Sequence, residues 1–569
     1  FWFSPRDGRA EGAVTDAAMA CGGCFSFLRR DGARPEAPPR GARGAVLVLV
    51  GMRGAGKSTF SKAAARAAKR QVLDLDRVLE EKVIGCKIRE FVDANGWAAF
   101  RAKEAELLED VLIRGAHIAD PAAGCVVATG GGVIETASSV ELLRRHSPVV
   151  WIDRHIDDIM VCLEGDGAYR PGLGEPPRDI YRRRRPLYEA CSDFTFSMRR
   201  GADNWALLDR RFAHFVEWAE DRARDPANVV IVPIVATSVA AAAADVREAA
   251  AEGAGLVELR LDFIAGGPGA AAEGLPSLIA AARRCGLPVL ATFRPQWEDK
   301  SAGYSGPDAP RFEVLQLAAR LGAYYVDVER GAHEAWLAAG GLPAGCRTRL
   351  VVSSHDFAKT LPPEELRARF EEMRGLAGPE GVVKLAQMPK TGCEAGRMLT
   401  LLAGEGGGTV ALAMGETGVF TRVLAPAFPR TRFTFGCLRG RASAPGQLTV
   451  LEMVETLGLG SASPGMPVFG MLQPGAFGCR VAGAVTAGLA AAGRGGVCAP
   501  IPVRGCSAEE LLASLPSGAL AKWVVEDEVG DSGAAEQARR LYVHFTGDAA
   551  PAPAVLAAMD GAAARAAAA

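Results

Sequence analysis

The feature that most constrains the fold is an alternation of short apolar runs with longer helical stretches between residues 229 and 438. The apolar runs predict buried strands, and the amphipathic segments between them, many Ala-rich, predict helices. Eight such units in a row have the size and rhythm of a TIM barrel; the alternative, an open doubly wound sheet, lacks a Gly-rich dinucleotide turn after its first strand. The strand candidates are VVIVPIVA, LVELRLDFI, LPVLATFR, YYVDVE, RLVVSSHDF, VVKLAQM, TVALAMG and RFTFGCL.

Polar residues at the C-terminal ends of these candidates predict one site, because parallel barrel strands all end at one mouth. Lys384 lies within an apolar strand, where burial of an ammonium is costly, and this makes it a candidate amine nucleophile. Alone it could be a lysine reaching solvent from a strand end, and each of the others could be a salt bridge at the barrel mouth. Together they favour an active site. The other residues are Glu258, Arg260, Arg294, Glu298, His355, Met414, Arg422, Ser443 and Gln447.

A phosphate-binding loop is predicted upstream, where the strand AVLVLV runs directly into GMRGAGKST and a helix. Its glycines let backbone N–H groups point at phosphate oxygens, while Lys57 adds positive charge and Ser58 can reach Mg²⁺. The strand before the loop and the helix after it make a chance match improbable. The predicted ATP-binding residues are Gly51, Gly54, Ala55, Gly56, Lys57, Ser58 and Thr59.

A second short strand, QVLDLD, carries Asp74 and Asp76. Strand alternation puts both side chains on one face, where they could hold Mg²⁺ and accept a proton from a hydroxyl. The alternative, which the sequence favours equally, is that an aspartate of DLD caps the following helix. Further on, VVATGGGVI places Gly131 and Gly132 after a third strand, which permits close approach of a ligand or a tight turn.

Bulk properties exclude several partners and leave others open. The chain has 65 basic and 66 acidic residues, which gives no sign of a nucleic-acid partner, and no apolar run is long enough to span a membrane. Its 13 scattered cysteines suit free thiols in a reducing compartment, and the CGGC at 21–24 is a fortuitous spacing. Residues 1–44 read as disordered or linker-like. We expect a cytoplasmic protein, with a plastid location open because the chain begins at Phe1.

The motifs between 45 and 223 come in the order found in shikimate kinase: the P-loop, DLD, FRAKE, TGGG, a lid with Arg170-Pro171, and RRPLYEACS. This stretch resembles that family, and its lid is most similar to the kinase part of fungal-type arom polypeptides. The resemblance implies ATP and Mg²⁺ as cofactors, with Lys57, Ser58 and Asp74 serving them and Arg170 closing over the transferring phosphoryl group. The arginine that commonly flanks adenine is not evident in the lid. The residues that it implies for shikimate are Asp76, Arg101, Gly131, Gly132 and Arg184.

The stretch 228–451 resembles type I 3-dehydroquinate dehydratase through ELRLD, FRPQWE, SSHDF, VKLAQM, GVFTR and SAPGQ. The resemblance implies that Lys384 forms an imine with the substrate ketone, that His355 is the general acid and base, and that Glu298 orients His355. It implies no cofactor. Arg422 would bind the substrate carboxylate. The residues implied to hold hydroxyls and close the lid are Glu258, Arg260, Arg294, Ser443 and Gln447, with Met414 also at the site. Asp299 and Lys300 replace two glycines usual in the family.

Residues 464–569 resemble the start of a shikimate dehydrogenase, but the expected Ser-x-Ser falls in QPGAFGC and no GxGxxG follows a strand. We expect a truncated module without dehydrogenase activity, and a structural cap on the barrel is the alternative. The combined prediction is a multifunctional shikimate-pathway enzyme acting on 3-dehydroquinate and shikimate, which needs a separate shikimate dehydrogenase. A homodimer and a longer parent polypeptide stay open. The rivals are a quinate-pathway repressor-like regulator and a chain with one active domain.

Overall fold

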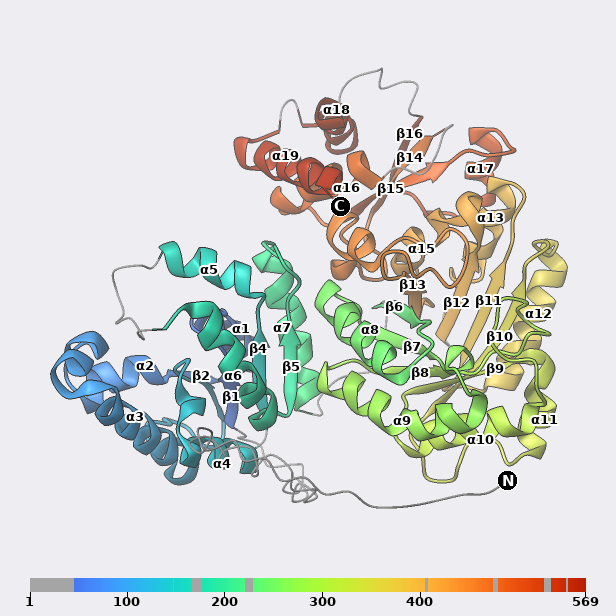
Figure 1. The fold of residues 1–569 in the computed structure, drawn as a ribbon. Helices are drawn as coiled ribbons and strands as arrows, with labels where there is room; N and C mark the ends of the chain where they lie inside the picture. Colours follow the sequence, from blue (N-terminus) through green and yellow to red (C-terminus); the bar gives the residue numbers. More distant parts are fainter. Residues whose placement is uncertain are drawn as a thin grey trace, which may run out of the picture. The chain divides into compact units, whose positions relative to one another are not determined.

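The structure is a computed structural model, and it describes residues 46–146, 148–165, 175–220, 229–404, 408–473, 479–525, 534–548 and 551–568. Three separate parallel sheets organise these residues, with helices packed around each of them (Figure 1). None of the helices in these ranges has the length and apolar character that crossing a bilayer requires.

The first sheet has five parallel strands in the order β2-β3-β1-β4-β5, with helices on both faces (Figure 1). This order brings the loops that follow β1 and β3 to one crevice. The sequence predicts the first four strands, the fourth from the apolar run VVWID at 149–153, but misses β5, a four-residue run behind a charged segment. The strands are β1 (Val46–Val50), β2 (Gln71–Asp74), β3 (Cys125–Ala128), β4 (Val149–Asp153) and β5 (Phe194–Ser197). The helices are α1 (Lys57–Ala68), α2 (Leu75–Val78), α3 (Ile88–Arg114), α4 (Ala137–Arg145), α5 (Ile156–Gly165), α6 (Pro177–Cys191) and α7 (Trp205–Ala219).

The second sheet contains all eight predicted barrel strands, ordered β12-β11-β10-β9-β8-β7-β6-β13 and parallel throughout. An isolated bridge between Thr409 and Thr431 brings β12 beside the residues that lead into β13, so the barrel nearly closes. The TIM-barrel prediction is therefore confirmed. The strands are β6 (Val229–Ile234), β7 (Leu256–Arg260), β8 (Val289–Thr292), β9 (Tyr325–Glu329), β10 (Arg349–Asp356), β11 (Val382–Gln387), β12 (Gly408–Ala413) and β13 (Phe433–Phe435).

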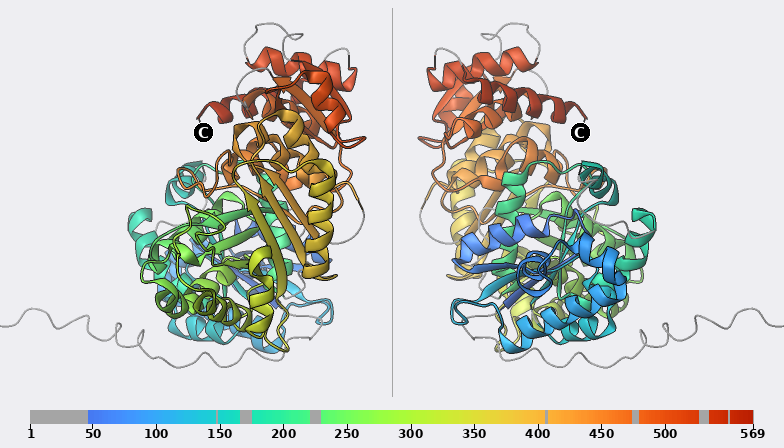
Figure 2. Two further views of the ribbon diagram at one scale, coloured as in Figure 1. Left: turned by 90° about the vertical axis from the view of Figure 1, so that its right-hand side faces the viewer. Right: turned by 90° about the vertical axis from the view of Figure 1, so that its left-hand side faces the viewer.

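Helices follow most of these strands and cover the outside of the barrel (Figure 2). They are α8 (Val239–Glu252), α9 (Gly267–Arg284), α10 (Asp308–Arg320), α11 (His333–Ala338), α12 (Pro363–Ala377), α13 (Gly392–Thr400), α14 (Gly415–Gly418) and α15 (Phe420–Leu424).

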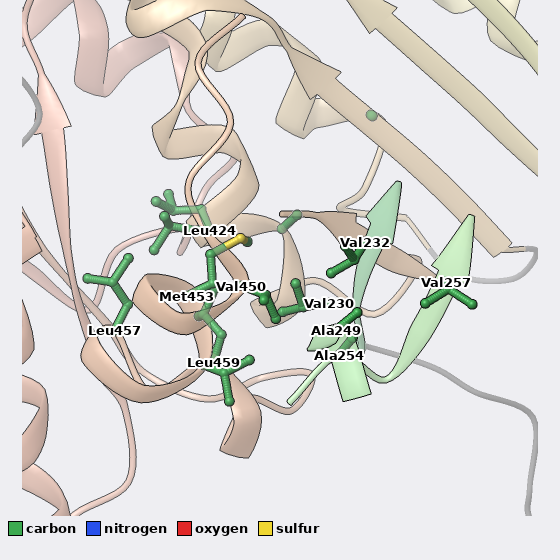
Figure 3. Packing of buried hydrophobic residues seen from close by; sticks show 14 of the residues in the cluster. Val230, Val232, Ala249, Ala254, Val257, Leu424, Val450, Met453, Leu457 and Leu459 are labelled. Atoms are coloured by element: carbon green, nitrogen blue, oxygen red, sulfur yellow. The ribbon is translucent and has the colours of Figure 1, made fainter. Parts of the chain in front are cut away.

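Strand alternation divides the apolar residues of the barrel into two cores. Ile231 belongs to an inner cluster with Leu256 and Val351, whereas its neighbours Val230 and Val232 belong to the outer cluster beneath the helices. Figure 3 shows Val230, Val232 and Val257 of the strands together with Met453 and Leu457. The residues that follow the last strand thus pack against the outside of the barrel.

The third sheet is small, with three parallel strands in the order β15-β14-β16. Helices α16 and α19 pack against one another beside it (Figures 1 and 2). Its apolar residues, including Val468 and Met471, are continuous with the outer core of the barrel. The elements are β14 (Val468–Gln473), α16 (Cys479–Ala491), β15 (Val497–Pro502), α17 (Ala508–Ser514), β16 (Lys522–Val525), α18 (Ala534–Thr546) and α19 (Pro553–Ala568).

Candidate active sites

The barrel site is a cavity at the C-terminal ends of the strands, where the sequence predicts it. All of the predicted barrel residues except Glu298 line the cavity. Glu298 contacts His355, which is one of the lining residues. Asp299 lines the cavity as well, with its Oδ2 3.9 Å from the Arg260 guanidinium. The predicted residues in the lining are Glu258, Arg260, Arg294, His355, Lys384, Met414, Arg422, Ser443 and Gln447.

Lys384 lies in the middle of β11, and its ammonium is held between two buried carboxylates. Its Nζ is 3.2 Å from Glu258 Oε1 and 3.2 Å from Asp327 Oδ2, and it lies 4.5 Å from the centre of the Phe435 ring. A buried charge of this kind is retained only when it is paired. The carboxylates therefore explain how β11 tolerates a lysine, and they fix the direction in which the amine points.

His355 is positioned by Glu298, which lies on the loop after β8. One carboxylate oxygen, Glu298 Oε1, accepts from the His355 backbone N–H at 2.6 Å and lies 3.1 Å from Nδ1. Burial, followed by the charge of Arg294, lowers the pKa of His355. Burial alone would raise the pKa of Glu298, but the hydrogen bond and charge of His355 lower it. The pair therefore favours a neutral imidazole with Nδ1–H toward the carboxylate and Nε2 free to accept a proton.

Arg422 brings a poorly compensated cation into the same cavity. It is buried, its nearest recorded partner is the Phe435 carbonyl at 3.5 Å, and its Nε has no hydrogen-bond partner among the described residues. Burial lowers its pKa to about 10. An isolated guanidinium in a dry cavity is costly, so the geometry favours an anionic ligand there. Nearby, Ser443 and Gln447 close one loop on itself through the bond from the Ser443 N–H to Gln447 Oε1 at 2.7 Å.

Arg260 and Arg294 are already engaged by carboxylates. Arg260 makes two bonds to Asp262 at 2.8 and 2.9 Å, and Arg294 donates to Glu329 at 2.6 Å. Arg294 also lies 2.9 Å from Asp327 Oδ1. These arginines are thus held by carboxylates outside the cavity lining, and only part of each guanidinium is left for a ligand.

The phosphate-binding loop lies between β1 and α1, as predicted. Gly54 and Gly56 have φ values of 79° and 98°, a left-handed conformation that favours glycine. Lys57 Nζ donates to the carbonyls of Gly51 and Met52, each at 2.9 Å, and so lies curled over the loop. Ala55 and Thr59 occupy the loop and the first turn of α1. The backbone and the helix N-terminus fit a nucleotide phosphate.

Asp74 is the last residue of β2, and its carboxylate accepts two hydrogen bonds. Its Oδ2 accepts from the Ser58 hydroxyl at 2.8 Å, and its Oδ1 caps α2 by accepting from the Arg77 N–H at 3.4 Å. Hydroxyl and carboxylate oxygens fit Mg²⁺. The expectation that strand alternation brings Asp76 to the same face is wrong, because the strand stops at Asp74 and Asp76 lies in α2.

Asp76 nevertheless faces the crevice. A Cβ added to Gly130 would lie 2.8 Å from Asp76 Oδ1 and 2.3 Å from Glu104 Oε1. Glu104 is buried, which raises its pKa, and Oε1 has no hydrogen-bond partner among the described residues. Two acceptors therefore converge on the three-glycine turn, and a hydroxyl-bearing ligand there would satisfy Glu104 Oε1.

Glu135 gathers the arginines of this site. Arg101 lies 3.2 Å and Arg184 2.9 Å from Glu135 Oε2, while Arg183 is 2.7 Å from Oε1. Arg184 also donates to the Gly131 carbonyl at 3.1 Å, and Gly132 sits against the Arg101 guanidinium. The predicted residues Arg101, Gly131, Gly132 and Arg184 therefore lie together.

The sequence reasoning missed Asp327 and Glu135, although both carry a readable signal. Asp327 is a charge inside the apolar run YYVDVE, and Glu135 follows the TGGG turn. The sequence also shows no evident lid arginine of the kind that commonly flanks adenine. In the structure Arg154 donates to the Gly54 carbonyl at 2.8 Å and stacks 5.3 Å from Trp205. Arg170, predicted in the lid, lies outside the described residues, as does CGGC at 21–24 and most of QPGAFGC.

Two family models match the chain, one for each site. The model for type I 3-dehydroquinase matches residues 230–463, and the model for shikimate kinase matches residues 53–212. The chain joins a shikimate kinase domain to a type I 3-dehydroquinase domain. The loop with Lys57 belongs to the kinase domain, and the cavity with Lys384 belongs to the dehydroquinase domain.

The two domains occur together in curated relatives. The chain is 28% identical over 72% of its length to the pentafunctional AROM polypeptide of Candida glabrata and 30% identical over 72% to that of Malassezia globosa. It spans about a quarter of these relatives, 26% and 25%. A 3-dehydroquinate dehydratase structure from Geobacillus kaustophilus is similar to it at 23% identity and a TM-score of 0.35, covering 41% of this chain and 93% of that one.

Proposed function

We propose that this chain catalyses two steps of the shikimate pathway. The dehydroquinase domain dehydrates 3-dehydroquinate to 3-dehydroshikimate, and the kinase domain phosphorylates shikimate with ATP at its 3-hydroxyl. A reduction separates these reactions, so a separate shikimate dehydrogenase supplies it. The family matches support both assignments. The observation that carries the first is the cavity that combines Lys384, the His355–Glu298 pair and the under-partnered Arg422.

In the dehydroquinase domain, Arg422 binds the substrate carboxylate and so orients the ketone toward Lys384. The amine passes its proton to water and attacks the carbonyl carbon, and loss of water from the adduct leaves an imine. His355 Nε2 then removes the proton on the carbon beside the imine, whose nitrogen accepts the electron pair. The protonated imidazole helps the β-hydroxyl depart as a second water, and hydrolysis of the imine restores Lys384.

In the kinase domain, the loop around Lys57 binds the ATP phosphates, and Ser58 and Asp74 are the residues that would hold Mg²⁺. Asp76 accepts the proton of the shikimate hydroxyl, while Arg101 and Arg184 bind the acid with Gly131 and Gly132. The protein's part is placement and positive charge, with little covalent participation. Arg170 is proposed to close over the phosphoryl group.

A regulator that keeps ligand binding without catalysis would be expected to lack the imine lysine or the P-loop lysine. Lys384, His355, Lys57 and Asp76 are all present, which favours an enzyme.

Borohydride reduction with 3-dehydroquinate tests the dehydratase. It should add substrate mass to the peptide that contains Lys384, and an unmodified peptide in a folded sample would refute the imine mechanism. For the kinase, Lys57→Ala should abolish ATP-dependent phosphorylation of shikimate and leave dehydration intact. If both activities disappeared in a folded Lys57→Ala chain, the assignment of two independent sites would be wrong.

A further inference from the structure

We propose that Cys393 and Cys506 are a redox site, at which a reversible disulfide ties the small C-terminal sheet to the mouth of the dehydroquinase barrel. Cys393 is the second residue of α13 in the barrel, and Cys506 lies in the loop between β15 and α17. The two residues are 113 positions apart in the chain. The proposal concerns the contact between these modules and does not depend on either catalytic activity.

The backbone brings the two cysteines together. The Gly392 N–H donates to the Arg504 carbonyl at 2.8 Å, so the start of α13 and the loop after β15 run side by side. A Cβ added to Gly392 would lie only 3.4 Å from Cys506 Sγ. Cys506 Sγ also lies 3.7 Å from the Arg504 carbonyl, the acceptor for the Gly392 N–H, so it sits beside the residue that precedes Cys393. The sulfur of Cys506 thus lies against the first turn of α13, where Cys393 is the next residue, and a disulfide requires this kind of backbone proximity.

Both thiols are reachable. Cys393 and Cys506 are half-buried, whereas Cys125, Cys285 and Cys498 are buried inside their domains. Peroxide reacts with the thiolate form of a partly exposed cysteine, and a second cysteine nearby resolves the first product. Among the described cysteines these two meet both conditions.

The oxidant is hydrogen peroxide, and the reaction balances in two steps. The Cys506 thiol loses its proton and attacks peroxide, giving a sulfenic acid and a hydroxide, which takes up that proton as the first water. Cys393 then attacks that sulfur, an S–S bond forms, and the hydroxyl leaves as a second water. Two electrons pass from the two thiols to the peroxide, and a dithiol reductant reverses the bond by exchange. Burial and the neighbouring Cys506 raise the pKa of Cys393 to about 12, so the second step is slow at neutral pH and accelerates as pH rises.

The bond would act on the barrel mouth. The loop 388–391 directly follows β11, which carries Lys384, and Arg504 forms an ion pair with Glu416 at 2.9 Å, two residues after Met414. One loop of the C-terminal sheet thus contacts the segments that follow β11 and β12. A disulfide here would hold these segments in place. Because it lowers the conformational entropy of the unfolded chain, it would also stabilise the module against separate unfolding.

Peptide mapping of the peroxide-treated full chain tests the proposal. After alkylation and trypsin, the expected product is a linked pair of peptides 391–397 and 505–522, which dithiothreitol separates. Its rate of formation should rise with pH. The melting transition of the C-terminal module should also shift to higher temperature in the oxidised chain and return on reduction.

Controls make either result decisive. Cys393→Ser and Cys506→Ser should each abolish the linked pair and the melting shift, while Cys346→Ser, at another half-buried barrel cysteine, should abolish neither. Exposed Cys162 reports that the oxidant has acted. If Cys162 were oxidised while Cys393 and Cys506 stayed reduced or were linked to other cysteines, the proposal would be overturned.

Discussion

The Nζ of Lys384 and the Oδ2 of Asp327 lie 3.2 Å apart, on strands β11 and β9 that are separated in the sheet by β10. Ser353 on β10 completes the link by donating to Asp327 Oδ1 at 2.5 Å. Arg294 and the lysine together lower the pKa of Asp327, against the effect of burial. The carboxylate is therefore ionised at neutral pH, and it pairs with the lysine.

Asp327→Asn should lower the kcat of dehydration by about 100-fold, because Lys384 loses one of the two carboxylates that hold its amine in position. It should also destabilise the barrel by about 3 kcal/mol, since Arg294 and Lys384 lose a buried partner. Steady-state kinetics and chemical denaturation measure the two effects. Glu372→Gln, which removes surface ion pairs with Arg330 and Arg369 outside the cavity lining, should change neither. Full activity in Asp327→Asn would show that the carboxylate has no part in the reaction.

The pH dependence of dehydration follows from the lowered pKa of His355. His355 must be neutral to take a proton, so kcat/KM should be level at neutral pH and fall as pH decreases through a value below about 6.5. Glu298→Gln removes the carboxylate that stabilises the imidazolium, so the pKa of His355 should fall further and the acid limb should move to lower pH. The plateau should drop by about tenfold or more as the ring loses its orientation. Glu313→Gln, at an exposed position on α10, is the matched control. A limb that moved to higher pH would contradict the assignment.

Arg422→Met should raise the KM for 3-dehydroquinate by about 10- to 100-fold, the effect of losing a charged hydrogen bond to the substrate carboxylate. Its cost in stability should be small, because the wild-type guanidinium is buried with few partners. Arg311→Met is the contrast: Arg311 is equally buried but bonded to Glu329 at 2.7 Å, so its loss should destabilise the barrel. An unchanged KM in Arg422→Met would exclude this arginine from substrate binding.

Glu135→Gln should raise the KM for shikimate by about tenfold and leave the KM for ATP unchanged. The reason is that Glu135 positions Arg101 and Arg184 without touching the P-loop. Glu141→Gln removes only an exposed pair with Arg145 and should behave as wild type. Equal increases in both KM values would indicate a general distortion of the domain.

The barrel could be predicted from sequence because buried parallel strands leave continuous apolar runs, and their polar ends share one mouth. Lys384 and His355 stand out for that reason. Asp327 did not, since its partners Lys384 and Arg294 are far away in sequence and only the sheet order brings them together. Asp76 shows the opposite limit: the residue was found, but the point at which β2 gives way to α2 depends on capping by Asp74, which the pattern left at even odds.

The sheets of the two candidate sites share no strand, and every described site residue lies in one of these sheets or in the helices and loops around it. One consequence concerns genetics. A chain with Lys57→Ala and a second chain with Lys384→Ala, made in the same cell, would each supply the activity that the other lacks. Two defective alleles of this single gene should therefore complement one another, as if each were a lesion in a different gene.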